Sequence, residues 1–176
     1  MEFEVTHHET VYEGRAFDVR RDFVRLPNGQ QKQRDVVIHN PSVVIIPLDE
    51  NRQILFVRQY RHPIGDSILE LPAGVMEAGE TPLITAQREI REETGMGAED
   101  MKKIGKFYLA PGYSTELMYV YLARGLYPAA LPMDEDEDIR VEKVPSEHLV
   151  DQSKVAQFRD AKTLAALLLA RPYLLK

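Results

Sequence analysis

The segment GVMEAGETPLITAQREIREETGM, from Gly74 to Met96, limits the fold of this chain more tightly than any other stretch. Thr81 is suited to cap the N-terminus of a helix, and Pro82 fits the first helical position, where a missing N–H has no consequence. Gly95 suits the left-handed residue that commonly follows the last helical turn. These signals predict a helix from about Pro82 to Thr94, preceded by a loop that contains glycine.

The predicted helix carries a cluster of acidic side chains. Glu93 follows Glu89 by four residues and Glu92 follows it by three, so all three carboxylates project from one side of the helix. Most such clusters form a solvated helix face. Here Arg88 and Arg91 are too few to neutralise every carboxylate, and the upstream glycines indicate a backbone that approaches another group closely. Because Mg²⁺ takes carboxylate and phosphate oxygens as ligands, the spacing leaves both a solvated face and a metal site open.

Composition places the chain among ordinary globular proteins. Its 176 residues are 44% hydrophobic and 28% charged, which is enough to bury a core without cross-links. The absence of cysteine excludes disulfides, zinc–thiolate sites and thiol catalysis. The longest aliphatic run, residues 164–170, is too short to span a bilayer, and the acidic N-terminus lacks a signal-peptide pattern. We therefore expect a cytoplasmic protein that does not bind membranes.

The net charge of −6 comes mostly from one run, DEDED at residues 134–138. The remainder of the chain is nearly neutral and has no basic stripe with interleaved aromatic residues, which argues against a nucleic-acid polymer as partner. Taken alone, an acidic run of this kind is usually a solvated loop.

Alternating and aliphatic segments predict the other elements. Asn28-Gly29 lies between two alternating segments, which is a strong signal for an antiparallel β-hairpin near the N-terminus. Apolar residues at helical spacing predict a second helix within residues 155–169. Further strands are expected at residues 43–48, 54–57, 68–71, 107–109 and 118–122. Strands mixed with two helices favour an α/β sandwich with a mixed sheet.

The central segment resembles the Nudix box, G-x5-E-x7-R-E-U-x-E-E-x-G-U, in which U is an aliphatic residue. Its fixed positions are filled by Gly74, Glu80, Arg88, Glu89, Ile90, Glu92, Glu93, Gly95 and Met96. The resemblance implies an α/β/α sandwich with a mixed sheet as the catalytic domain, over residues 41–176. It also implies an N-terminal β region, over residues 1–40, that exchanges strands in a homodimer.

The same resemblance implies Mg²⁺-dependent hydrolysis of a nucleoside diphosphate linked to another group, with Mn²⁺ as a possible substitute. It makes Glu89 and Glu93 the main metal ligands, with Glu92 assisting in metal binding and catalysis and the carbonyl of Ala73 as a backbone ligand. Arg88 and Glu80 would orient the helix and the loop.

The resemblance gives the acidic run a second interpretation. Relatives carry a late glutamate, followed by x-hydrophobic-x-Val, that acts as the catalytic base. Glu137 in EDIRV matches this arrangement, and Glu135 is the alternative. A carboxylate is chemically suited to this task beside a metal that activates water.

Three features outside the box are similar to the ADP-ribose pyrophosphatase branch. LELPAG precedes the box, Pro111 follows Gly95 by 16 residues, and Arg61 lies in FVRQYRHPIG, where relatives place an arginine against the substrate's phosphates. This branch cleaves ADP-ribose to AMP and ribose 5-phosphate. By resemblance, Glu70 and Glu116 would bind ribose hydroxyls, water or metal, and Phe17 would stack on the adenine.

Alternatives to this substrate stay open. Taken alone, Pro111-Gly112 is more often a simple turn, and hydrolases of other nucleoside diphosphate sugars such as GDP-mannose share the proline. A third hypothesis is a ligand-sensing Nudix domain that binds ADP-ribose without cleaving it. Such sensors usually have a DNA-binding extension or a degraded box, and this box has every fixed position filled.

Overall fold

The computed structural model describes residues 3–133, 138–149 and 151–174. The chain divides into two compact units. Unit 1 comprises Met1–Pro41 and Tyr108–Leu117, and unit 2 comprises Ser42–Phe107 and Met118–Lys176. Within the described ranges, no helix has the length and apolar character needed to cross a bilayer.

Unit 1 is built on a three-stranded antiparallel sheet in the order β1-β2-β3. Its strands are β1 (Glu4–Tyr12), β2 (Asp18–Arg25) and β3 (Gln31–Ile38). The predicted hairpin is confirmed between β2 and β3, where Gly29 has a φ of 82° and the Leu26 N–H donates to the Gln30 carbonyl at 2.8 Å. The turn at residues 108–117 joins this unit through Val37, whose N–H donates to Tyr113 and whose carbonyl accepts from Thr115.

Unit 2 contains a mixed four-stranded sheet and an antiparallel three-stranded sheet, in the orders β7-β4-β9-β8 and β10-β5-β6. In the mixed sheet β4 runs parallel to β9 and antiparallel to β7. The mixed sheet is formed by β7 (Ala73–Val75), β4 (Ser42–Pro47), β9 (Leu117–Pro128) and β8 (Met96–Tyr108), and the other by β10 (Ile139–Pro145), β5 (Gln53–Arg61) and β6 (Asp66–Glu70). The short helical turns are η1 (His62–Ile64), η2 (Ser146–Leu149) and α2 (Gln152–Val155).

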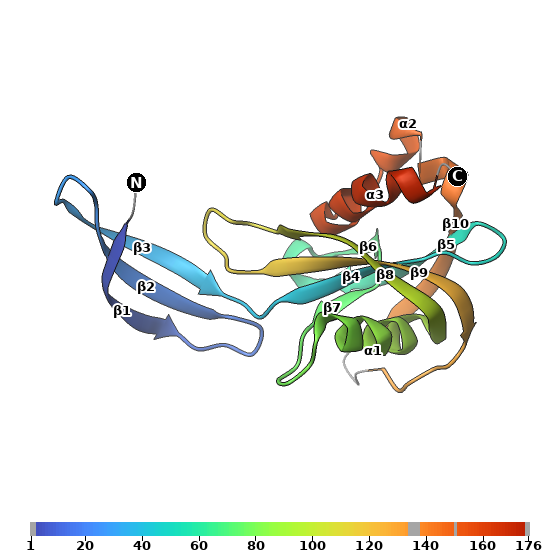
Figure 1. Cartoon of the computed structure of the whole chain (residues 1–176), viewed down its shortest axis with the longest axis horizontal. Helices are drawn as coiled ribbons and strands as arrows, with labels where there is room; N and C mark the ends of the chain where they lie inside the picture. Colours follow the sequence, from blue (N-terminus) through green and yellow to red (C-terminus); the bar gives the residue numbers. More distant parts are fainter. Residues whose placement is uncertain (1–2, 134–137, 150, 175–176) are drawn as a thin grey trace. The chain divides into compact units, whose positions relative to one another are not determined.

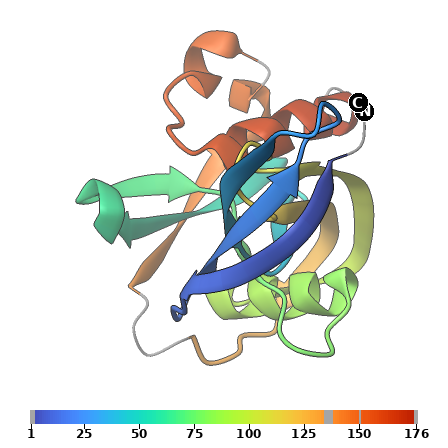
Figure 2. The ribbon, with the colours of Figure 1, turned by 90° about the vertical axis from the view of Figure 1, so that its left-hand side faces the viewer.

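The two longer helices cover opposite faces of the mixed sheet. Successive side chains of a strand point to opposite faces, and β4 is buried on both. Val43 and Ile45 pack in one apolar cluster with residues of α1 (Pro82–Thr94), and Val44 and Ile46 pack in another with residues of α3 (Ala161–Leu174). Figure 1 shows one helix on each side of the strands of unit 2, and Figure 2 shows the same layers from one end, with α1 below and α3 above. The predicted α/β/α sandwich with a mixed sheet is confirmed.

The first predicted helix is confirmed at both ends. Thr81 caps α1 by accepting a hydrogen bond from the Ile84 N–H, and Gly95 ends it with a φ of 72°. The second prediction, residues 155–169, is wrong at its start and its end. Asp160 accepts hydrogen bonds from the Thr163 N–H and hydroxyl, so a new helix begins at Ala161 and runs to Leu174.

The strands β7 and β10 were not predicted, and β8 is far longer than the expected residues 107–109. β7 is only three residues long, which is too short for an alternating pattern. β8 starts at Met96, directly after the residue that ends α1, and many of its residues are polar and exposed.

Phe56 is a direct probe of this packing. It is fully buried on β5 and stacks on Phe158, with ring centroids 5.0 Å apart and an interplanar angle of 13°. Phe56→Ala is expected to lower the free energy of unfolding by about 3 to 5 kcal/mol because it removes a large core side chain. Urea denaturation of the wild type, Phe56→Ala and Tyr60→Ala gives the comparison. Tyr60 lies on the same strand but is exposed, so its removal should cost far less; equal losses would contradict this core.

Candidate active site

Two glutamates of α1 are buried against the short strand β7. Glu89 and Glu93 have exposed fractions of 8% and 5%. One oxygen of Glu93 accepts a hydrogen bond from the Ala73 N–H at 3.0 Å. A Cβ atom on Gly74 would lie only 1.9 Å from Oε1 of Glu89, so the absence of a side chain at Gly74 lets this carboxylate lie against the strand. Packing therefore explains the glycine at the first position of the motif, because any larger residue would collide with Glu89.

Arg88 ties the acidic cluster to the preceding loop. Its Nη1 donates to Oε1 of Glu89 at 2.7 Å and to Oε2 of Glu92 at 2.9 Å. Its Nε and Nη2 donate to the two oxygens of Glu80 at 2.9 and 3.0 Å, and Nη2 also donates to the Val75 carbonyl at 3.1 Å. One guanidinium therefore holds three carboxylates and a carbonyl, which places the loop over the helix.

Glu80 has a structural part in this arrangement. Besides Arg88, it accepts hydrogen bonds from the Glu77 N–H at 3.0 Å and the Thr85 hydroxyl at 2.8 Å. The hydrogen bonds from Arg88 are the main cause that lowers the pKa of Glu80 to about 2, against a smaller opposing effect of burial. The pKa of Arg88 is raised by the same pairing, so both groups are charged at neutral pH.

The donor set suits a hard divalent cation. Such ions take oxygen ligands, and Glu89 and Glu92 each place an oxygen within 3 Å of the same cationic nitrogen of Arg88. Two carboxylates that both bind one nitrogen of Arg88 are close enough together to bind one metal ion. No group of three acidic or histidine side chains converges on a cation position within the described part of the chain. In the structure Glu93 binds Ala73 through the N–H of that residue.

A second ionic cluster lies at the ends of β5 and β6. Arg61 donates from Nε and Nη2 to the two oxygens of Glu70 at 2.9 and 2.7 Å, and Lys162 of α3 donates to the same carboxylate. The hydrogen bonds with Glu70 are the main cause that raises the pKa of Arg61, and the charge of Glu93 adds to the effect. Arg61 therefore lies within electrostatic range of the α1 cluster, and the structure brings Arg61 and Glu70 together. No sequence signal indicates a part for Lys162.

The other predicted substrate residues belong to unit 1. Phe17 is exposed and tilted against Tyr12, with ring centroids 6.3 Å apart. Glu116 lies in the turn that ends at Leu117, where its N–H donates to the Ser114 hydroxyl. Glu137 and Glu135, the candidates for the catalytic base, lie outside the residues that the structure describes.

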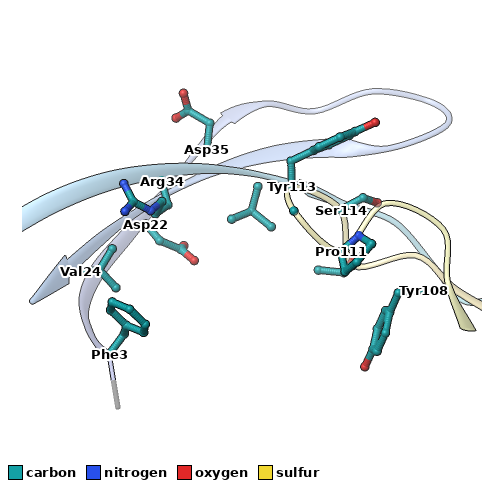
Figure 3. A pocket seen from close by; sticks show the side chains of 12 residues that line it. Phe3, Asp22, Val24, Arg34, Asp35, Tyr108, Pro111, Tyr113 and Ser114 are labelled. Atoms are coloured by element: carbon teal, nitrogen blue, oxygen red, sulfur yellow. The ribbon is translucent and has the colours of Figure 1, made fainter. Parts of the chain in front are cut away.

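Unit 1 also contains a pocket of about 660 Å³ that sequence reasoning did not anticipate as a whole. Pro111 contributes to its wall, and the aromatic residues Phe3, Tyr108 and Tyr113 are also among its lining residues (Figure 3). The nearly buried carboxylate of Asp22 adds a polar group. The proline that resembles a branch marker thus lines a cavity whose wall includes aromatic, aliphatic and charged side chains.

Comparisons with known proteins agree with this geometry. The model of the NUDIX domain family matches residues 38–167. An ADP-ribose pyrophosphatase of Bacillus subtilis is 36% identical over 90% of this chain and 87% of its own length, and one of Mycobacterium tuberculosis is 43% identical over 78% and 67%. A methanol dehydrogenase activator of Bacillus methanolicus is 37% identical over 90% and 87%. A crystal structure of an ADP compounds hydrolase superposes with a TM-score of 0.89 at 28% identity, over 99% of this chain and 95% of that one.

This chain belongs to the Nudix family and is a Nudix hydrolase. Nudix hydrolases generally use divalent metal ions, which agrees with the all-oxygen donor set on α1.

The lowered pKa of Glu80 predicts a pH-dependent contribution to stability. A carboxylate whose pKa is lower in the folded state stabilises the fold above its unfolded pKa, here 4.5, and loses that contribution as the pH falls towards about 2. At pH 7 Glu80→Gln should be less stable than the wild type by about 1 to 3 kcal/mol, the cost of losing a hydrogen-bonded charged partner. Thermal unfolding of both proteins between pH 7 and pH 2.5 should show the difference shrinking below pH 4.5. A difference independent of pH would contradict the assigned pairing with Arg88.

Proposed function

We propose that the protein hydrolyses the diphosphate bridge of ADP-ribose to AMP and ribose 5-phosphate. Water is added across one P–O bond of the bridge, and the departing phosphate takes a proton. The observation that carries the proposal is the pair of oxygens from Glu89 and Glu92 that converge on one cationic nitrogen, inside a chain whose relatives include ADP-ribose pyrophosphatases.

We assign the cation site to Glu89, Glu92, Glu93 and the carbonyl of Ala73, with Mg²⁺ as the natural ion and Mn²⁺ as a substitute. When bound, the ion supplies charge neutralisation for the phosphates and activation of water. The residues of the chain hold it in place: α1 fixes the carboxylates at helical spacing, and Gly74 leaves room for Glu89. In the absence of a cation, Arg88 neutralises the two carboxylates that it contacts.

Other residues bind the substrate or move its protons. Arg61 has a side chain that is 38% exposed and is suited to bind the oxygens of the diphosphate. Glu137, with Glu135 as the alternative, accepts the proton of the attacking water. Phe17 stacks on the adenine, and Glu116 binds ribose hydroxyls or water. Glu70 is buried between two cations, and this favours action through Arg61 rather than through a direct contact.

The organisation proposed for the whole protein is a homodimer in the cytoplasm. Residues 1–40 form the β region that exchanges strands with a second copy, and residues 41–176 form the catalytic domain. The exposed apolar side chains on β1, including Val5, Val11 and Tyr12, suit a strand that is covered by a partner.

A second candidate is a different nucleoside diphosphate sugar. A GDP-mannose pyrophosphatase of Enterobacter is 29% identical over 73% of this chain and 71% of its own length. The carboxylates of α1 would serve that substrate equally well, because they act on the phosphates and the cation and not on the base.

Product analysis separates these substrates and tests the α1 site at once. ADP-ribose, GDP-mannose and ADP-glucose are incubated with Mg²⁺ or with a chelator, and the products are resolved by chromatography. We expect AMP and ribose 5-phosphate, formed fastest from ADP-ribose and only with the metal. Glu93→Gln should lower the turnover number about a hundredfold or more, since it removes a ligand of the ion that stabilises the transition state.

Glu99→Gln is the matched control, because Glu99 is an exposed glutamate on β8 that lies outside the motif. Its activity should equal that of the wild type. If GDP-mannose is cleaved fastest, the proposed cation site is retained and the proposal of ADP-ribose as substrate is wrong. Activity of Glu93→Gln near that of the wild type would contradict the role of the site itself.

A further inference from the structure

The first turn of α3 is bonded to the end of β6, two segments that lie about ninety residues apart in the chain. Lys162 donates to the carboxylate of Glu70 and forms a second ion pair, of 2.9 Å, with Asp160. The next residue, Thr163, accepts a hydrogen bond from the Leu71 N–H at 2.9 Å. Asp160 in turn accepts from the Thr163 N–H and hydroxyl. Lys162 is therefore held in place by its own helix end.

These bonds hold Glu70 and Leu71, which lie just before the residues that contact the α1 carboxylates. Ala73, which donates to Glu93, follows Leu71 by two residues, and Gly74, which faces Glu89, is next. The position of this short stretch thus depends on the start of α3 as well as on α1.

Glu70 carries a charge that is almost completely removed from water. Its side chain is 2% exposed, and it binds both Arg61 and Lys162. Burial alone would raise the pKa of Glu70, but the hydrogen bonds and charges of the two cations outweigh it and lower the pKa. The cations differ in accessibility, because the Arg61 side chain is 38% exposed and that of Lys162 is 12%.

We propose that Lys162 is a positioning residue that keeps Glu70 paired with a cation while Arg61 turns from Glu70 to the phosphates of the substrate. The part played by the substrate rests on the proposed function. A buried carboxylate without any cation is strongly unfavourable. In a chain without Lys162, Arg61 is the one cation left on Glu70 among the described residues, so it stays bound there. In the wild type, Lys162 removes this constraint, and the more accessible arginine becomes available to the diphosphate.

Stability measurements without substrate test whether Arg61 and Lys162 share Glu70 as a partner. Melting temperatures are measured for Arg61→Met, Lys162→Met and the double variant. Each single variant leaves Glu70 with one cation, and the double variant leaves it with neither. We expect the loss in the double variant to exceed the sum of the single losses, since residues with a shared partner are not additive. Additive losses would overturn the proposal.

Where the double variant does not fold, Glu70→Met is added to it. Removing the buried charge should restore a folded protein with a cooperative melting transition, and failure to restore it counts against the proposal.

The release of Arg61 is tested by kinetics on ADP-ribose. Lys162→Met should raise KM about tenfold with little change in kcat, in line with losses seen when supporting residues of a site are removed. Lys162→Arg should restore most of the lost affinity. The double variant should have the KM of Arg61→Met alone, because Lys162 acts through Arg61.

Lys154→Met is the control, because Lys154 is an exposed lysine on the neighbouring α2, and its KM should not change. An unchanged KM in Lys162→Met, or effects on KM that multiply in the double variant, would overturn the proposal. If the wild type does not cleave ADP-ribose, the proposed function fails, and the melting temperatures alone then decide whether Glu70 is shared.

Discussion

The pairing of one guanidinium with three carboxylates is the interaction on which the site depends. Glu89 and Glu92 would repel each other on α1, and Arg88 removes the repulsion by binding an oxygen of each. The same group binds Glu80 on both oxygens, so the loop before the helix is held where its backbone approaches α1. A motif with five glutamates can therefore fold before any cation arrives. The oxygens that bind Arg88 include those that we assign to the cation.

The sandwich of helices and sheet holds Arg88 and its carboxylate partners in position. β4 is buried on both faces, with α1 packed on one and α3 on the other, and β7 lies beside β4 at the edge of the mixed sheet. β7 carries Ala73 and Gly74, so its register with β4 sets where Glu93 and Glu89 can rest. Both helices reach this region, α1 through its carboxylates and α3 through Thr163 and Lys162. The candidate site is thus supported by both helices and not by α1 alone.

The sequence predicted an element correctly where residues next to that element determine its ends. Thr81 and Gly95 define α1 because caps act within one turn, and Gly29 defines the hairpin for a similar reason. The second helix was misplaced because apolar spacing continues across Asp160, whose capping bond is what starts α3. The Glu70 partners were missed because nothing near Lys162 in sequence indicates a bond to a strand ninety residues earlier. The pocket at Pro111 likewise needs β2, β3 and the turn at residues 108–117 together.

Binding of Mn²⁺ measures the central claim most directly, that the α1 carboxylates which neutralise Arg88 also bind a divalent cation. The free ion is followed by electron paramagnetic resonance during titration of the wild type, Glu89→Gln, Glu92→Gln and Glu99→Gln. Loss of a carboxylate ligand should weaken binding about tenfold or more in the first two variants, since hard cations depend on charged oxygen ligands, and Glu99→Gln should bind as the wild type does. Equal affinity in all four proteins would show that the cation binds elsewhere and would contradict the account.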